Sequence, residues 1–124
     1  LLKTASGRLL IACLPEEERR SLLKRLRPAR AEAAGLAESL RALAVEGCCV
    51  AEDETMRGVR DVVVPVAFGA SGAAAALACS MLMRGASDPG AAEYRAGLEK
   101  AAKEIARRLG LGLKAGGPGR DFSP

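Results

Sequence analysis

A nearly unbroken apolar run, residues 59–67, constrains the fold of this 124-residue chain more than any other feature. A strand with apolar side chains on both faces has to be covered on both faces, which places it in the centre of a sheet. The stretch 69–72, Gly-Ala-Ser-Gly, follows at once and predicts a hairpin turn. Residues 73–83 are therefore predicted to form the next strand. Their alanines favour helix intrinsically, and the tight turn and the partner strand decide for strand.

Helical patterns lie on both sides of these strands. N-cap residues, a Pro-Glu-Glu-Glu start, leucines at helical spacing and terminal glycines indicate four helices. We expect them at residues 5–13, 15–27, 29–46 and 89–109, with a further short strand at 48–52. Three helices, three hairpin-linked strands and a last helix predict an α+β fold with an antiparallel sheet. The Gly/Pro-rich residues 111–124 are predicted to form a flexible tail.

The composition argues against several classes of function. The chain has no histidine, the commonest general base and metal ligand, and its four cysteines lack the paired spacing of a zinc site. Aromatic residues make up 2% of the chain, too few to stack single-stranded nucleic acid, and the net charge of +4 is only mildly basic. Without a signal peptide or an apolar run of membrane-spanning length, we expect a cytoplasmic protein with reduced thiols, no membrane partner, no metal and no cofactor.

Two adjacent cysteines follow the third predicted helix. Cys48 and Cys49 fall in a predicted strand, so their side chains point to opposite faces and cannot share a metal without a distorted backbone. We expect one of them in the core and the other half-exposed. The basic run between Arg19 and Arg30 is expected to be a solvated helix face paired with the preceding glutamates, with phosphate contact as the alternative.

Asp61 is unusual because it lies early in the apolar run. A buried acid needs a partner, and two interpretations stay open. The acid forms a salt bridge with Arg57 or Arg60, or it is a polar group that lines a pocket. The neighbouring acids at 52–54 lie near a strand end, where we expect them to be solvated or salt-bridged.

Four segments, in order, resemble the C-terminal effector-binding domain of IclR-family transcription regulators. The first, "TASGRLLIACLPEEE", is similar to the family segment that follows the first strands of that domain. The others are "GCCVAEDETMRGVRDVVVPV", "GASGAAAALACS" and "LEKAAKEIARRLG", the last of which resembles the closing helix. The resemblance implies a GAF/PAS-like antiparallel sheet with flanking helices. It implies an N-terminally incomplete effector-binding domain over residues 1–110, followed by the tail.

The resemblance also implies where an effector binds. Family effectors lie on one side of the sheet and contact an acid, a cysteine, two Ser/Thr positions and the turn before the first helix. Carried over, these positions are Thr4, Ser6, Gly7, Ala51, Asp61, Ala78 and Ser80. Asp61 replaces the thiol and Ala78 a hydroxyl, which predicts an effector that donates hydrogen bonds or carries positive charge. Small anionic or aromatic carboxylates, bound at the helix N-terminus, are the alternative.

The function that the resemblance implies is regulatory. It implies a bacterial transcription regulator whose small-molecule effector changes the arrangement of subunits in a homodimer or tetramer. DNA would be bound only through an N-terminal winged helix-turn-helix that this sequence lacks. The alternatives are a small enzyme that uses an acid such as Asp61 or Glu54, and a plain oligomerisation module. The missing histidine and the lack of a nucleophile–base pair argue against an enzyme.

Overall fold

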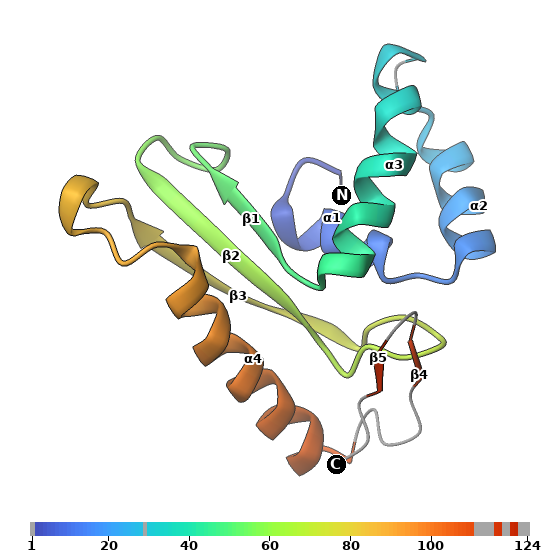
Figure 1. The fold of residues 1–124 in the computed structure, drawn as a ribbon. Helices are drawn as coiled ribbons and strands as arrows, with labels where there is room; N and C mark the ends of the chain where they lie inside the picture. Colours follow the sequence, from blue (N-terminus) through green and yellow to red (C-terminus); the bar gives the residue numbers. More distant parts are fainter. Residues whose placement is uncertain (1, 29, 111–115, 118–119, 122–124) are drawn as a thin grey trace.

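The computed structural model describes residues 2–28, 30–110, 116–117 and 120–121 (Figure 1). Helices precede and follow a group of three strands, as the sequence predicts. The elements are α1 (Ala5–Ala12), α2 (Glu16–Leu26), α3 (Arg30–Glu46), β1 (Cys49–Glu52), β2 (Val59–Val66), β3 (Ala75–Leu82), η1 (Gly85–Ser87), α4 (Ala91–Arg108), β4 (Gly116–Gly117) and β5 (Arg120–Asp121).

The main sheet is antiparallel and has the order β1-β2-β3. β2 is the central strand, and residues 61–66 are buried throughout. An apolar strand of this kind requires cover on both faces, because its alternating side chains enter two separate cores. The α+β class and the central position of this strand are confirmed.

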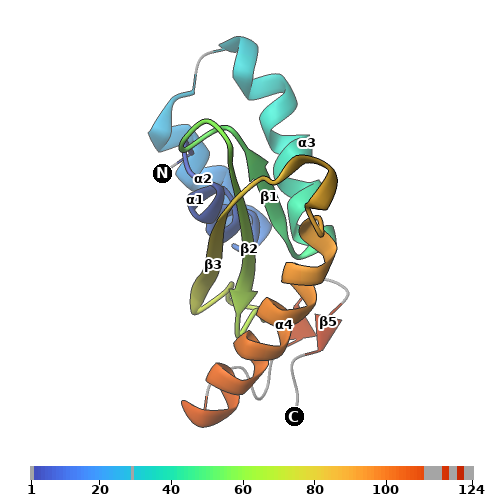
Figure 2. The same ribbon diagram turned by 90° about the vertical axis from the view of Figure 1, so that its left-hand side faces the viewer.

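A helix covers each face of the sheet (Figure 2). α1 packs on one face, where Leu9 contacts a cluster that includes Val63 and Phe68. α4 packs on the other face, where Ala102 and Ala106 lie against the even-numbered valines of β2. Burial of such side chains is the main stabilising term of a small domain, at about 25 cal/mol per Å² of apolar surface. The sheet therefore has two sides with different neighbours.

The predicted hairpin between β2 and β3 is confirmed. Gly69 and Gly72 exchange two backbone hydrogen bonds, of 2.9 Å and 3.0 Å, which closes the turn. Gly72 has a φ of +108°, and a Cβ there would lie 3.5 Å from the carbonyl oxygen of Cys13. The glycine thus allows the end of α1 to approach the turn closely.

A third apolar cluster joins α2 and α3 to α1. Leu40 and Ala44 of α3 are buried against Ile11, and Leu22 and Leu23 of α2 pack beside them. The predicted leucine stripe of α2 is correct only in part, because Leu26 is 39% exposed. α2 contains no fully buried residue, so it is an outer layer of the domain.

The basic run on α2 is mostly solvated, as the sequence predicts. Arg20 forms a 3.4 Å ion pair with Glu16, one helical turn earlier. Arg19 donates a 3.0 Å hydrogen bond to the carbonyl oxygen of Ala12 and thereby caps the end of α1. The latter contact has a structural role that the sequence pattern did not indicate.

Polar contacts fix the position of α4. Arg60 of β2 forms ion pairs with Asp88 (2.7 Å) and with Glu52 (2.9 Å). Asp88 also accepts a 2.8 Å hydrogen bond from the backbone amide of Gly90, directly before the helix begins. Further along α4, Arg95 binds the carboxylate of Glu46 and donates a 2.7 Å hydrogen bond to its carbonyl oxygen. These contacts hold α4 to the sheet and to the end of α3.

The predicted tail, 111–124, falls largely outside the described residues. Within it, Gly116–Gly117 pairs antiparallel with Arg120–Asp121. The sequence pattern did not indicate this pairing, and the boundary of the effector-binding domain at residue 110 stays a prediction.

Candidate functional site

Three of the predicted site residues form one row across the sheet. Ala51 lies opposite Asp61 in the β1–β2 pairing, and Asp61 lies opposite Ser80 in the β2–β3 pairing. Ala78 lies opposite Val63, two residues further along the same face. Because alternate residues of a strand share a face, all four side chains are on the side covered by α1.

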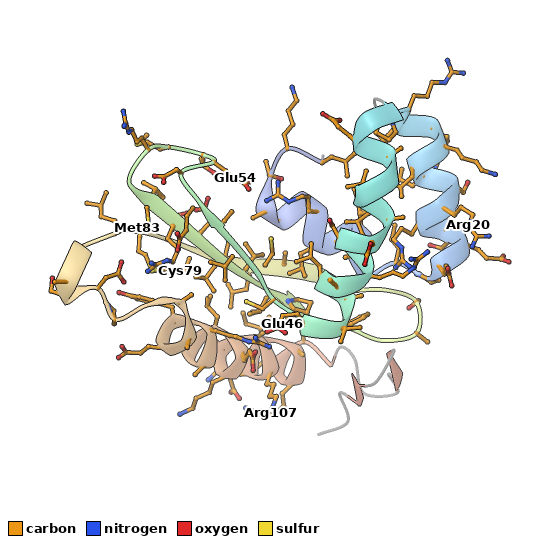
Figure 3. The ribbon with its side chains drawn as sticks, turned by 45° about the horizontal axis from the view of Figure 1, so that its top comes forward. Arg20, Glu46, Glu54, Cys79, Met83 and Arg107 are labelled. Carbon is orange, nitrogen blue, oxygen red and sulfur yellow. The ribbon has the colours of Figure 1, made fainter. Side chains whose placement is uncertain are left out.

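The start of α1 lies at the Asp61 end of this face. Arg8, in the second turn of the helix, forms a 2.6 Å ion pair with Glu54 in the loop after β1. Figure 3 shows Glu54 in this loop, beside the beginning of α1. The other end of α1 approaches the β2–β3 turn at Gly72. The two contacts fix the direction of the helix over the sheet.

The N-terminus of α1 is closed by its own cap. Thr4 has an extended backbone, and its hydroxyl oxygen accepts a 3.0 Å hydrogen bond from the amide of Gly7. This occupies one of the free amides that would otherwise bind an anion. The predicted N-cap is confirmed, and the alternative anion site at Ser6, Gly7 and Arg8 loses one of its donors.

The partners of Asp61 differ from the expected arginines. Asp61 is only 7% exposed. Its carboxylate accepts a 2.7 Å hydrogen bond from the Thr55 hydroxyl and a second one from the Ser80 hydroxyl. The predicted salt bridge with Arg60 is wrong, because Arg60 points to the α4 side of the sheet and pairs there with Glu52 and Asp88. Two hydroxyls satisfy the buried acid instead.

Thr55 is the site residue that sequence reasoning missed. It belongs to the loop between β1 and β2, which is closed by a 2.6 Å hydrogen bond from the Gly58 amide to the Asp53 carboxylate. Asp53 itself has a φ of +60°, which turns the loop back on the sheet. A buried acid in the following strand could have indicated a hydroxyl partner in the loop, but spacing alone does not select Thr55.

The predicted site residues differ in exposure. Gly7 and Ala51 are buried, and Ser6 is half-buried. Thr4, Ala78 and Ser80 are exposed. Ala51, Asp61, Ala78 and Ser80 lie on the α1 face of the sheet, and Thr4, Ser6 and Gly7 lie at the start of α1, which covers that face.

Both adjacent cysteines are buried, each 4% exposed, on opposite sides of the sheet. The expectation that one is half-exposed is wrong, because α4 covers Cys48 as fully as α1 covers Cys49. Burial raises the pKa of both thiols, although Arg95 lowers that of Cys48 and Arg8 lowers that of Cys49. The thiols are therefore protonated at neutral pH and are weak nucleophiles.

Arg8 is a cation at the Asp61 end of the α1 face, where it pairs with Glu54. Burial lowers its pKa, but the hydrogen bond and charge of Glu54 outweigh this effect, so the pKa lies above its ordinary value. Arg8 also donates a 3.3 Å hydrogen bond to the carbonyl oxygen of Leu2. The guanidinium is thus already engaged on two sides.

The described part of the chain lacks a membrane-spanning helix and a metal-binding cluster. None of its helices has the length and apolar character needed to cross a membrane. Its His, Cys, Asp and Glu side chains form no group of three or more that could hold a metal ion.

Solved structures of transcription regulators share this fold. A putative transcriptional regulator, RHA06195 from Rhodococcus sp. RHA1, superposes with a TM-score of 0.69 at 26% identity, over 86% of this chain and 46% of that one. IclR from Thermotoga maritima gives a TM-score of 0.67 at 30% identity, over 88% of this chain and 47% of that one. The chain thus spans less than half the length of these two proteins.

A third structure shares the fold at lower identity. It is the inducer-binding domain of a double mutant of PobR from Acinetobacter, in complex with 3-hydroxybenzoic acid. The TM-score is 0.58 at 23% identity, over 82% of this chain and 62% of that one. No curated protein sequence matches the chain significantly.

These similarities define the class of protein as a regulatory domain of a transcription regulator. The family described as bacterial transcriptional regulator IclR C-terminal matches residues 1–107, so the chain belongs to this family. The resemblance seen in the sequence is confirmed. The chain is an effector-sensing domain, and neither the enzyme nor the plain oligomerisation module is favoured.

Proposed function

We propose that this domain binds its small-molecule effector between the start of α1 and the polar row of the sheet. The observation that carries the proposal is the alignment of Ala51, Asp61 and Ser80 on the α1 face, with Thr4 and Ser6 at the helix end above it. A buried carboxylate beneath exposed hydroxyls is an uncommon arrangement for a surface with only a packing role. It provides polar groups on an apolar floor, as small-molecule sites usually do.

We further propose that effector binding controls DNA binding by a separate part of a longer protein. The structurally similar Rhodococcus and Thermotoga proteins are about twice as long as the matched region, which supports further domains in such regulators. In this proposal the regulator is a cytoplasmic homodimer or tetramer, and it contacts DNA through an N-terminal winged helix-turn-helix. An effector acts by binding one subunit arrangement more tightly than the other.

The domain is proposed to bind its ligand without turning it over. Asp61, the acid in the row, is engaged by two hydroxyls, and Glu54 is paired with Arg8. The hydroxyls held by Asp61 lack the histidine that usually activates such a nucleophile, because the chain has none. Cys49, on the same face, is buried, and burial raises the pKa of its thiol. This arrangement suits recognition rather than acid–base chemistry.

Thermal unfolding with a panel of small amines, carboxylates and neutral hydroxylated compounds tests the proposal. A true effector raises the melting temperature in a concentration-dependent way, by the equivalent of about 2.7 kcal/mol at about 100 times Kd. It is recovered unchanged. Asp61→Ala is expected to lose this shift, whereas Ser71→Ala, at the exposed tip of the β2–β3 turn, is expected to keep it. Equal shifts in Asp61→Ala would place the site elsewhere, and consumption of the compound would favour an enzyme.

A further inference from the structure

We propose that the cluster of Thr55, Asp61 and Ser80 selects effectors that carry a protonated amine and disfavours carboxylates. This inference rests on the proposed function, because it names the chemical class of ligand for the same site. It assigns a selecting role to Thr55, which lies outside the residues carried over from the family.

The direction of the two hydrogen bonds limits what the hydroxyls of Thr55 and Ser80 can still bind. A hydroxyl has one hydrogen to donate and two lone pairs that accept, whereas an aspartate carboxylate at neutral pH only accepts. Thr55 and Ser80 both donate their hydroxyl hydrogen to Asp61. Their oxygens can then only accept from a further partner. The buried acid thus fixes the polarity of the two hydroxyls above it.

The two hydroxyl residues are more exposed to solvent than the acid that they bind. Asp61 is 7% exposed, while Thr55 and Ser80 are exposed. A ligand that approaches from the solvent therefore reaches Thr55 and Ser80 before it reaches the carboxylate of Asp61. A carboxylate would present acceptor to acceptor and would also be repelled. It could bind only if a hydroxyl turned away and left Asp61 without one of its donors, which is costly for a buried charge.

Arg8 is the cation that could reverse this preference for an amine over a carboxylate. Arg8 is held by the 2.6 Å ion pair with Glu54 and by the carbonyl oxygen of Leu2. A carboxylate ligand would have to displace Glu54 to use it. The local charge therefore favours a cation, since Asp61 has no basic partner among the hydrogen bonds that satisfy it.

Pairs of ligands with the same skeleton and opposite charge provide the test. We would titrate the 124-residue chain by calorimetry with 3-hydroxybenzylamine and 3-hydroxybenzoate, and with benzylamine and benzoate. The amine is expected to bind at least about tenfold more tightly than its carboxylate, as for close charge pairs at interfaces. Tighter binding of the carboxylate would overturn the inference while leaving an effector site in place. Failure of all four compounds and of the wider panel to bind would overturn the proposed function and the inference with it.

Variants of similar shape isolate the cause. Asp61→Asn removes the charge and turns one hydroxyl outward as a donor, so the preference for the amine should fall to about equal affinity. Glu38→Gln, an exposed position on α3, makes the same change in net charge and should keep the preference. If Asp61→Asn does not fold, Ser80→Ala serves instead and should weaken amine binding several-fold. Unchanged amine binding in either variant would contradict the proposal.

Discussion

The carboxylate of Asp61 and the hydroxyl of Ser80 lie opposite each other in neighbouring strands and are joined by a hydrogen bond. Removal of the hydroxyl in Ser80→Ala should lower the free energy of unfolding by about 1 kcal/mol, because a bond to a charged group is lost near the surface. Urea unfolding measures the change. Ser71→Ala, at an exposed turn position, should stay within about 0.5 kcal/mol of the wild type. Equal effects of the two substitutions would contradict the structural importance of this bond.

Two glycines should respond with opposite signs to the same substitution. Gly72 has a φ of +108° and lies beside the backbone of Cys13, so Gly72→Ala is expected to destabilise the domain by about 1–2 kcal/mol. Gly97 lies within α4 with open space around it, so Gly97→Ala should stabilise it by about 0.5–1 kcal/mol. Thermal unfolding of both variants checks the pair. A stabilising Gly72→Ala would show that the turn adopts another conformation.

Acid should weaken the attachment of α4. The hydrogen bond from Arg60 and those from the amides of Gly90 and Arg84 hold the pKa of Asp88 below its ordinary value of 3.8. A carboxyl group with a lowered pKa in the folded state stabilises that state above its ordinary value. This contribution is lost as the pH falls from about 3.8 through the lower folded value. The melting temperature measured between pH 7 and pH 2 should therefore drop in this window.

Asp88→Asn provides the comparison for the acid response. Its stability should be lower than that of the wild type at pH 7, and the difference should shrink as the pH falls below the ordinary aspartate value. Glu93→Gln, at an exposed position of the same helix, should follow the wild-type curve. A constant difference between Asp88→Asn and the wild type at all pH values would rule out the proposed ionic contribution.

Thiol labelling should distinguish the cysteines. Cys48 and Cys49 are buried and burial raises the pKa of both thiols, whereas Cys79 on β3 is half-buried. In native protein at pH 8, a disulfide reagent is expected to modify Cys79 first and the adjacent pair only at the rate of unfolding. Mass spectrometry after short reaction times identifies the modified residue. Early labelling of Cys49 would mean that α1 does not cover that face continuously.

Local sequence features predict much of this fold. The apolar run and the glycine turn were enough to predict that residues 75–82 form a strand, although their alanines favour helix. The caps at Thr4 and Gly47 were similarly predictable, because each depends on residues next to it in the chain. Here the pairing partner and the turn decide the structure, and both immediately precede the strand in the sequence.

The partners of the polar site residues could not be predicted in the same way. Alternation along the strand correctly separated Cys48 from Cys49, but the burial of Cys48 depends on α4, which begins about forty residues later. Asp61 follows Arg57 and Arg60 closely in the sequence, yet strand geometry turns the side chain of Arg60 to the opposite face. The hydroxyl of Thr55 reaches the acid only because Asp53 folds the loop back. Such contacts depend on backbone paths that residue spacing does not fix.

Arg95 fastens α4 to the end of α3, and the apolar cluster around Leu40 fastens α3 to α1. Together these contacts encircle one edge of the sheet. Because each helix is attached to the next, a displacement of one helix strains its contacts with its neighbour. A molecule that tilts the start of α1 would therefore also shift α4 on the far side of the sheet. The outer surface of α4 carries arginines and glutamates.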